Sequence, residues 1–315
     1  MPEPLVDPGL ETGLHAADQV LEVTVPAASA AVETVDAGRP RGKRQVAMWL
    51  AISWLTVLTF LAVFADALPF VDSYTKTFPG QYKKPPSWDH WFGTTKIGKD
   101  VFSLTVYGAR LSLLIAATAI VFGLLVGGTL GLIAGYFRGR ADGGISMGVD
   151  IMLAFPPLVL ALAMTNFTQD RIPRAAAVIL VLAILSIPAL TRVVRASTLV
   201  YSNREFVVAA RSVGAKNGRV IFREVLPNVM PSMLTFALTG LALLIIAEGA
   251  LAFLGSSVAP PQATWGRLIG EGRTELEDAW WISLLPSAVL FLTVLSFNLL
   301  GDILSKRFDI RESSL

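Results

Sequence analysis

Six apolar stretches, each long enough to cross a lipid bilayer, constrain the fold of this chain more than any other feature. They cover residues 46–65, 111–136, 148–168, 175–194, 230–254 and 282–304. A helix rises about 1.5 Å per residue, so roughly 20 apolar residues span a hydrocarbon core of about 30 Å. A helix also satisfies every backbone hydrogen bond within such a segment. The pattern therefore predicts an all-α membrane protein with six transmembrane helices.

The composition agrees with a membrane protein and excludes several kinds of chemistry. The chain is 53% hydrophobic and 16% charged, with a mean hydropathy of +0.60, far from the values of a soluble domain. Without cysteine it can form neither a disulfide nor a thiolate metal site. Its two histidines, His15 and His90, lie outside the apolar stretches. We therefore expect no metal site, no catalytic cluster and no nucleic-acid surface.

Basic residues at the ends of the apolar stretches predict the orientation, because cytoplasmic loops carry an excess of Lys and Arg. They place both termini and the even-numbered connections in the cytoplasm of a multi-pass cell-membrane protein. The external connection 66–110 also carries lysines, which weakens this assignment. The basic clusters are Arg39, Arg41, Lys43 and Arg44, then Arg138 and Arg140, seven residues within 192–223, and finally Lys306, Arg307 and Arg311.

The chain divides into a tail and a membrane domain. Residues 1–38 are acidic and rich in Ala, Val and Pro, the reverse of a positively charged signal peptide. We expect this tail to be a disordered cytoplasmic segment. Residues 39–315 form the predicted transmembrane domain. Its fourth stretch is the weakest, because Pro188 lies within it, although membrane helices tolerate a proline when neighbouring helices satisfy the freed backbone groups.

The basic connection 195–229 has the pattern of two short helices. Ser202 and Glu205 match a capping box that begins a helix, and Gly214 is a natural helix end. A second short helix, with Lys216, Arg219 and Arg223 on one face, is predicted to end before Pro227. Such a helix pair offers a surface to a cytoplasmic partner. The alternative is a basic loop that only obeys the orientation rule.

One motif in this connection resembles the "EAA" loop of ABC-importer permeases. Ala209-Ala210-x-x-x-Gly214 is followed at the expected distance by Leu226-Pro227, with Val208 in place of the glutamate and Glu224 where isoleucine is common. In that family the loop is the coupling helix that docks into an ATPase subunit. The resemblance implies an ATPase-coupling role for Glu205, Ala209, Ala210, Arg211, Gly214, Leu226 and Pro227.

Further motifs resemble the permeases of peptide and nickel importers. The run Gly93 to Asp100 matches part of a phosphate-binding loop, but Asp100 stands where Ser or Thr would bind magnesium and no apolar strand precedes it. With the Gly-Ala-Arg110 that follows, the run is similar to the segment before the second core helix of those permeases. The resemblance covers about residues 88–311 and includes Glu248 to Gly255, Pro260-Pro261-x-x-x-Trp265-Gly266, and Phe297-Asn298-x-x-Gly301-Asp302.

The resemblance implies a type I ABC-importer permease-like core, most similar to the C-type subunit of dipeptide and oligopeptide importers. It also implies a homologous permease partner, two ATPase subunits that hold ATP and magnesium, an extracytoplasmic solute-binding protein, and contact with membrane lipid. The chain itself would bind no cofactor and catalyse no reaction. Alternatives are a permease for nickel or another small solute, a secondary transporter, and a membrane enzyme, although the sequence shows neither the inverted repeats nor the polar clusters that the last two require.

Within the apolar stretches, small and polar residues mark candidate functional positions. The glycines 123, 127, 131 and 135 recur every four residues, a spacing that allows close helix packing, in either a static or a moving seam. Buried polar residues in a membrane are functional candidates because their burial is expensive. Glu248 is expected either to line a polar path or to pair with another helix. Asn298, the second path candidate, is expected to form a hydrogen bond between helices.

Overall fold

The computed structural model describes residues 41–168 and 171–312, so the acidic tail 1–38 lies outside the described residues. The chain divides into two compact units, residues 1–47 and 48–315. The described part of the first unit is the N-terminal part of helix α2 (Arg41–Val63). The second unit contains the rest of α2 and the helices that follow it.

The described residues form helices joined by short connections, apart from the longer segment 64–100 between α2 and α3. In chain order after α2 the elements are α3 (Val101–Phe137), α4 (Gly139–Leu153), α5 (Pro157–Thr168), α6 (Arg174–Tyr201), α7 (Glu205–Ser212), α8 (Asn217–Arg219), η1 (Val220–Val225), α9 (Leu226–Phe253), α10 (Trp265–Gly272), η2 (Arg273–Glu275) and α11 (Trp281–Glu312).

Five helical segments are long and apolar enough to cross a membrane, and a sixth span arises if α4 and α5 are counted together. The five are Gln45–Val63, Val101–Phe137, Arg174–Tyr201, Asn217–Phe253 and Trp281–Phe308. They overlap five of the six predicted spans almost completely. The predicted membrane helix around Pro188 is continuous, with the proline inside α6.

The prediction of one helix over 148–168 was wrong. The segment contains the end of α4 and all of α5, and these two helices meet at an angle of 84°. The break coincides with Pro156 and Pro157. A proline cannot donate a backbone hydrogen bond, and it disfavours helical geometry in the residue before it, here Phe155. Two consecutive prolines therefore end α4 although the hydropathy of the segment stays high.

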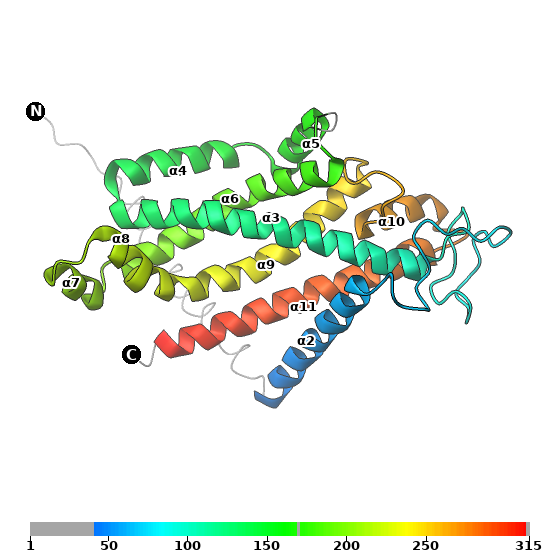
Figure 1. Ribbon diagram of the computed structural model, residues 1–315, viewed down its shortest axis with the longest axis horizontal. Coiled ribbons are helices and arrows are strands. Elements are labelled where there is room, and N and C mark those ends of the chain that lie inside the picture. The colour runs from blue at the N-terminus through cyan, green and yellow to red at the C-terminus, as the bar shows by residue number, and fades with distance from the viewer. Residues whose placement is uncertain (1–40, 169–170, 313–315) are drawn as a thin grey trace, which may run out of the picture. The chain divides into compact units, whose positions relative to one another are not determined.

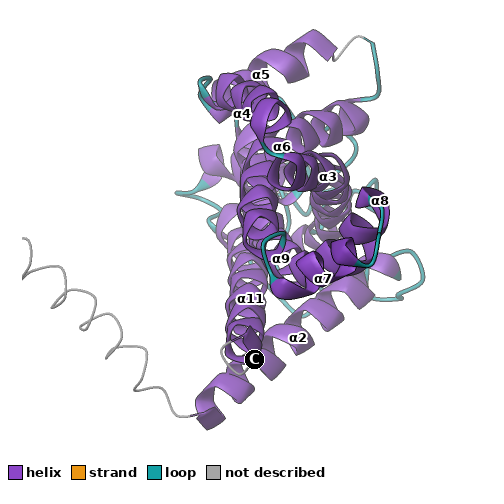
Figure 2. Ribbon diagram, turned by 90° about the vertical axis from the view of Figure 1, so that its left-hand side faces the viewer, coloured by secondary structure: helices purple, strands orange, loops and turns teal. Residues whose placement is uncertain are grey.

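The core of the second unit lies where α3, α6 and α9 pack together. Its buried side chains include Ile115 of α3, Leu182 of α6 and Ile245 of α9. Figure 1 shows these three helices running side by side, with α11 next to α9. The end-on view in Figure 2 shows the same grouping. The indole Nε1 of Trp54 in α2 donates to Thr293 Oγ1 of α11 at 3.1 Å.

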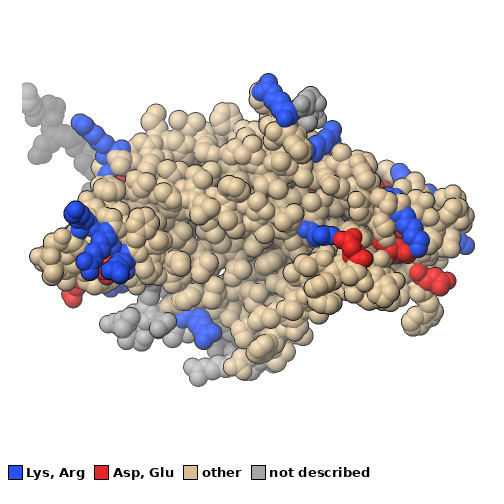
Figure 3. Space-filling model, in the orientation of Figure 1, with Lys and Arg blue, Asp and Glu red and all other residues tan. Residues whose placement is uncertain are grey.

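Charged side chains gather at the two ends of the helices. In Figure 3 the middle of the visible face is almost free of charge, and blue side chains cluster at the end where Figure 1 places α7 and α8. The exposed residues in the middle are large and apolar, such as Leu125 of α3 and Phe291 of α11. An uncharged band between two charged ends is the surface that a bilayer or a neighbouring membrane subunit would cover.

Helix α3 begins ten residues earlier than the predicted span at 111–136. Asp100 is its N-cap and accepts a hydrogen bond from the backbone N–H of Ser103 at 3.3 Å. The prediction began after Arg110 because a charged residue ends an apolar window. The structure continues the helix through Arg110, whose side chain is half exposed beside Asp66.

Candidate functional site

The segment between α7 and α8 reverses direction at Gly214. This glycine has φ +86°, a conformation that residues with a side chain rarely adopt. Its N–H donates to Arg211 O at 2.9 Å, and the N–H of Ala215 donates to Ala210 O at 3.1 Å. These two bonds are the Schellman motif that ends many helices. A Cβ at Gly214 would meet no atom within 4 Å, so the requirement for glycine here comes from the backbone conformation alone.

The predicted capping box of Ser202 and Glu205 was wrong. The N-cap of α7 is Arg204, which makes no side-chain cap. Ser202 belongs to the end of α6, where its hydroxyl donates to Leu199 O at 3.3 Å. The guanidinium of Arg138 also holds this corner and donates to Asn203 Oδ1 at 2.7 Å. The sequence pattern was misleading because α6 continues to Tyr201 and uses Ser202 at its own end.

The second short helix does not end before Pro227, contrary to the prediction. A π-helical turn, η1, follows α8 and runs directly into α9, with the N–H of Leu226 donating to Ile221 O. The wider turn accommodates Pro227, which lies in the first turn of α9 and has no N–H to donate. The side-chain amide of Asn228 donates to Glu224 O at 2.6 Å. The surface helix is therefore continuous with a membrane span.

One face of this segment is fixed to the helical bundle. Val207 and Val220 belong to a buried cluster with Tyr136 of α3, and Ala210 is partly buried against it. The hydroxyl of Tyr136 donates to Asn217 Oδ1 at 3.0 Å, and the guanidinium of Arg211 lies 4.9 Å from the centre of the Tyr136 ring. Leu226 packs at the edge of the same cluster.

The other face is exposed and partly apolar. Glu205, Ala209 and Gly214 are exposed, and so are large apolar side chains next to them. Val208, Val213 and Phe222 have exposed fractions of 56%, 89% and 68%. Sequence reasoning did not select these three residues. The sequence did offer one signal for an apolar surface here: Val208 is an apolar residue at the position where the EAA motif has its glutamate.

The glycine series of α3 lies against α6. A Cβ on Gly131 would be 2.7 Å from Thr191 O, and one on Gly127 would be 2.8 Å from Ile187 O. Gly123 and Gly135 face Ser186 and Thr198 at still shorter distances. A side chain at Gly127, Gly131 or Gly135 would force the two backbones apart, and one at Gly123 would collide with the side chain of Ser186. The seam therefore lies within this chain, between α3 and α6.

Glu248 of α9 is fully buried. Its carboxylate accepts hydrogen bonds from Ser112 Oγ of α3 at 3.1 Å and from Ser257 Oγ at 2.8 Å. The Ser112 hydroxyl in turn accepts one from the N–H of Trp265 at the start of α10. Glu248 is thus bonded directly to α3 and, through Ser112, linked to α10. The side-chain amide of Asn298 donates to Val294 O of its own helix at 3.0 Å, and the expected bond between helices stays a prediction.

The run from Gly93 to Asp100 forms a compact turn at the start of α3. Thr94 and Asp100 make an isolated bridge, and the indole of Trp281 donates to Thr94 O at 3.3 Å. The ammonium of Lys99, the lysine of the phosphate-loop match, donates to Tyr74 O at 2.7 Å. Burial raises the pKa of Asp100. The residues of the match thus serve to fold the 64–100 segment onto the helix ends.

Ion pairs connect this segment to neighbouring elements. The ammonium of Lys83 lies 2.5 Å from Glu275 Oε2 and 3.2 Å from Asp278 Oδ2. The hydrogen bond from Lys83 lowers the pKa of Glu275. Hydrogen bonds from Tyr107 and Arg110 likewise lower the pKa of Asp66. These carboxylates are therefore ionised at neutral pH.

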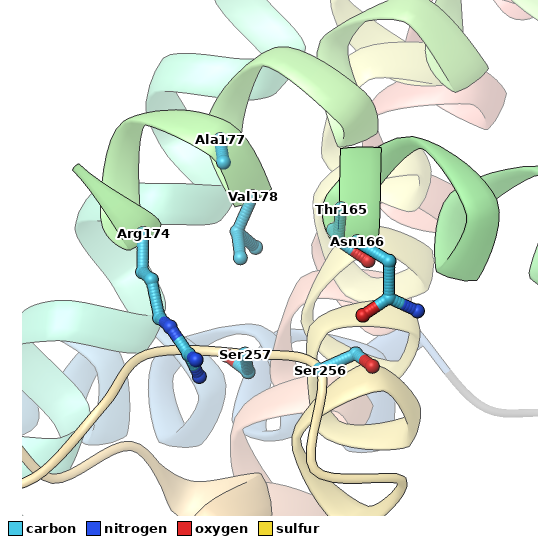
Figure 4. A pocket seen from close by; sticks show the side chains of 7 residues that line it. All are labelled: Thr165, Asn166, Arg174, Ala177, Val178, Ser256 and Ser257. Carbon is cyan, nitrogen blue, oxygen red and sulfur yellow. The ribbon is translucent and has the colours of Figure 1, made fainter. Parts of the chain in front are cut away.

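A small cavity lies where α5 and α6 approach the connection after α9. Figure 4 shows Arg174 and Asn166 on opposite sides of it, with Ser256 and Ser257 below. Its volume is about 10 Å³, enough for roughly one water molecule. It is therefore too small for a solute.

Among the described residues, no three His, Cys, Asp or Glu side chains lie close enough to hold a metal ion.

Residues 127–313 match the family model described as "Binding-protein-dependent transport system inner membrane component". This match covers more than half of the chain, including the α7–α8 segment, Glu248 and most of the glycine seam. The chain belongs to this family. It is a multi-pass inner membrane protein, the permease component of an ATP-driven importer rather than an enzyme. The complexes of this family contain ATPases and a binding protein.

Curated relatives cover most of this permease. A dipeptide transport system permease protein, DppC, of Alkalihalophilus pseudofirmus is 38% identical over 84% of this chain and 87% of its own length. A glutathione transport system permease protein, GsiD, of Pectobacterium atrosepticum is 36% identical over 81% of this chain and 84% of its own. A di/tripeptide transport system permease protein, DppC, of Pseudomonas aeruginosa is 37% identical over 81% of this chain and 85% of its own length.

Solved structures share the fold. A chain of the MetNI methionine ABC transporter, in an inward-facing conformation, has a TM-score of 0.56 at 20% identity, covering 65% of this permease and 96% of that chain. A chain of an amino acid ABC transporter with histidines has a TM-score of 0.51 at 18% identity. The match covers 65% of this permease and 94% of that chain. At these identities the likeness supports the predicted type I permease-like core and nothing about the solute.

Proposed function

We propose that this permease is the C-type subunit of an importer for dipeptides and oligopeptides. The observation that carries the proposal is the similarity to DppC of Alkalihalophilus pseudofirmus, which extends over 84% of the chain. The relatives from Pectobacterium atrosepticum and Pseudomonas aeruginosa carry glutathione or di/tripeptides by name. Glutathione is itself a tripeptide. These names favour a peptide over nickel, the alternative solute.

In this proposal the subunit works with a homologous permease, two ATPases and an external binding protein. The exposed apolar side chains of α3 and α11, such as Leu125 and Phe291, suit a second membrane subunit or lipid. ATP and magnesium bind to the ATPases. The basic α7–α8 end faces the cytoplasm together with both termini, as the positive-inside rule requires.

The α7–α8 segment is the proposed contact with an ATPase. Its exposed face combines Val208, Val213 and Phe222 with Glu205 and Ala209, and an apolar centre with a polar rim is the usual anatomy of a protein interface. Its inner face is bound to Tyr136 of α3. Gly214 and Pro227 shape the segment, while Arg211 and Leu226 hold it against the helical bundle.

The continuity of α8, η1 and α9 provides a route for coupling. Because the turn at 220–225 is helical and runs into α9, a displacement of the docked segment moves the cytoplasmic part of α9 with it. Glu248, farther along α9, is bonded to Ser112 of α3 and adjoins α10. We therefore propose that Glu248 positions helices. Of the two candidates for the translocation path, Glu248 is fully buried and Asn298 is partly exposed.

The experiment that tests this function is uptake by the reconstituted importer. The permease, a homologous permease, the ATPases and the binding protein encoded beside it would be purified together and placed in vesicles. We expect ATP-dependent uptake of a radiolabelled dipeptide, with ATP hydrolysis stimulated by the loaded binding protein. Uptake of nickel without any peptide uptake would overturn the choice of solute. Peptide uptake without ATP would overturn the coupled mechanism.

A further inference from the structure

Three cavities of comparable size surround the connection 258–263 and α10. One contains Arg174 and Arg267 with Glu271, and its volume is about 320 Å³. Another contains Lys96, Lys99 and Arg267 with Glu271, and measures about 290 Å³. Both have more cationic than anionic side chains. The third measures about 330 Å³ and is the one with a single anion, Asp66, and a single cation, Arg110.

This third cavity lies at the end of the helices opposite α7 and α8. It is bounded by the first turns of α3, the segment after α2 and residues 262–263. The guanidinium of Arg110 donates through Nη1 to Asp66 Oδ2 at 2.8 Å, and the hydroxyl of Tyr107 donates to Asp66 Oδ1 at 2.7 Å. Both charged side chains are half exposed or more.

Much of the hydrogen-bonding capacity in this cavity is unused by the described residues. The bond to Asp66 uses one of the five N–H groups of Arg110. Each Asp66 oxygen accepts one bond and retains a second acceptor position. The side chain of Gln262 lies at the same opening. Leu111 and Leu114 supply an apolar wall, and Leu114 is 57% exposed.

We propose that this cavity is a binding subsite for a short zwitterionic peptide. The peptide carboxylate binds Arg110, its ammonium group binds Asp66, and its first side chain lies against Leu111 and Leu114. The inference rests on the proposed function and adds a solute contact on this subunit. The cavity volume falls within the usual range for small-ligand sites, about 300–1,000 Å³.

The charge balance of the cavity selects this ligand class. Arg110 and Asp66 already form an ion pair, so the cavity has no net charge. A zwitterion brings one carboxylate and one ammonium group and keeps the cavity neutral, whereas a free anion or cation would add a net charge. Charge-assisted hydrogen bonds to such groups are roughly twice as strong as neutral ones. The headgroup of phosphatidylethanolamine has the same pair of charges, so the test must separate a peptide from a lipid.

Protection of a single cysteine tests the subsite in the complete importer. The native chain has no cysteine, so Leu114→Cys reports from the cavity wall and Leu276→Cys, 43% exposed and outside this cavity, is the control. In vesicles of phosphatidylglycerol alone, we expect dialanine to slow maleimide labelling of Leu114→Cys. The C-terminal amide of dialanine should protect at least tenfold more weakly, and Leu276→Cys should not be protected.

Matched substitutions connect this protection to the ion pair. Arg110→Gln should raise the half-protecting dialanine concentration about tenfold, since hydrogen bonds to charged groups contribute this much. Arg110→Lys should raise it less. Lys76→Gln removes the cation of the Lys76–Asp72 ion pair, which also lies on the 64–100 segment. It should leave the half-protecting dialanine concentration unchanged.

Separate outcomes overturn the subsite and the proposed function. If dialanine is transported but never protects Leu114→Cys, the subsite is wrong and the function stands. If dialanine protects but is not transported, the subsite stands and the choice of solute fails. Protection that requires phosphatidylethanolamine and ignores dialanine would assign the cavity to a lipid and overturn the proposal.

Discussion

The carboxylate of Glu248 in α9 accepts a hydrogen bond of 3.1 Å from the hydroxyl of Ser112 in α3. The Ser112 hydroxyl also accepts a bond from the N–H of Trp265 in α10, so one serine connects three helices. Since Glu248 has no exposed surface, protein groups replace the water that a carboxylate would otherwise require. The arrangement therefore fixes the positions of α3, α9 and α10 relative to one another.

Replacing Glu248 by alanine should destabilise the permease. The change leaves the hydroxyls of Ser112 and Ser257 without their acceptor and opens a cavity, at a cost of about 2–4 kcal/mol. Glu248→Gln, which keeps an acceptor oxygen, should cost less. Unfolding of the purified subunit in a denaturing detergent titration measures the difference. An exposed carboxylate, Glu277, provides the control substitution Glu277→Ala. Equal effects of the two alanine variants would contradict the structural role.

Two glycine-to-alanine substitutions should have opposite signs. A Cβ on Gly131 would lie 2.7 Å from Thr191 O in the backbone of α6, so Gly131→Ala must separate α3 from α6 and should cost about 1–3 kcal/mol. A Cβ on Gly148 in α4 would meet no atom within 4 Å. There alanine should stabilise the helix by up to about 1 kcal/mol. The same unfolding titration compares them. A stabilising Gly131→Ala would show that the seam has room.

Hydropathy predicted five of the six membrane segments because burial in lipid requires long apolar runs. It missed the break at Pro156 because a window average weighs a proline by its hydropathy and ignores its missing N–H. It also began the second span after Arg110, although the charge of Arg110 is accommodated by Asp66 at the helix end. These errors share a cause: the average does not contain the hydrogen bonds that end or extend a helix.

Local conformation could be read from the sequence, but contacts between distant residues could not. Gly214 was predicted as a helix end because only glycine takes a positive φ easily, and its φ is +86°. The contact of Gly266 with Gly249, where a Cβ on Gly266 would collide with the backbone of α9, depends on how α10 crosses α9. No local pattern encodes that crossing. The exposed Val213 was missed because apolar residues were assigned to the membrane.

Acid should loosen the connection between the 64–100 segment and η2. The folded-state pKa of Glu275 is lowered by its bond from Lys83. The stabilisation is therefore present above the unfolded pKa, about 4.3, and is lost as the pH falls through the lower folded value. Spin labels at Lys84→Cys and Glu277→Cys should show a narrow distance distribution at pH 7 and a broader one at pH 3. In Lys83→Gln the distribution should be broad at both. A wild-type distribution unaffected by acid would refute the prediction.

Single cysteine substitutions can also test the orientation in the membrane, because the native chain has no cysteine. Lys84, Leu276 and Lys216 are all exposed, so accessibility depends on the side of the membrane. We expect Cys at position 84 or 276 to react with an impermeant maleimide added to intact cells. Cys at position 216 should react only after the membrane is opened. Labelling of position 216 from outside would reverse the orientation.

Gly214→Asp should uncouple the permease from its ATPases without preventing insertion. The positive φ of Gly214 costs a residue with a Cβ about 1–2 kcal/mol, and the site lies beyond the membrane spans. We therefore expect normal amounts in the membrane but a several-fold loss of ATPase co-purification or of substrate-stimulated hydrolysis. Gly214→Asn should lose less, because asparagine tolerates this conformation better.

Arg204→Ala is the matched control for Gly214→Asp. Arg204 is exposed and precedes α7, yet its side chain makes no cap, so its removal takes a charge from the same surface without straining the backbone. We expect nearly normal co-purification and hydrolysis. If Gly214→Asp and Arg204→Ala both retain wild-type values, the α7–α8 segment does not couple and its charge serves orientation alone. If both lose activity equally, surface charge rather than the bend at Gly214 controls docking.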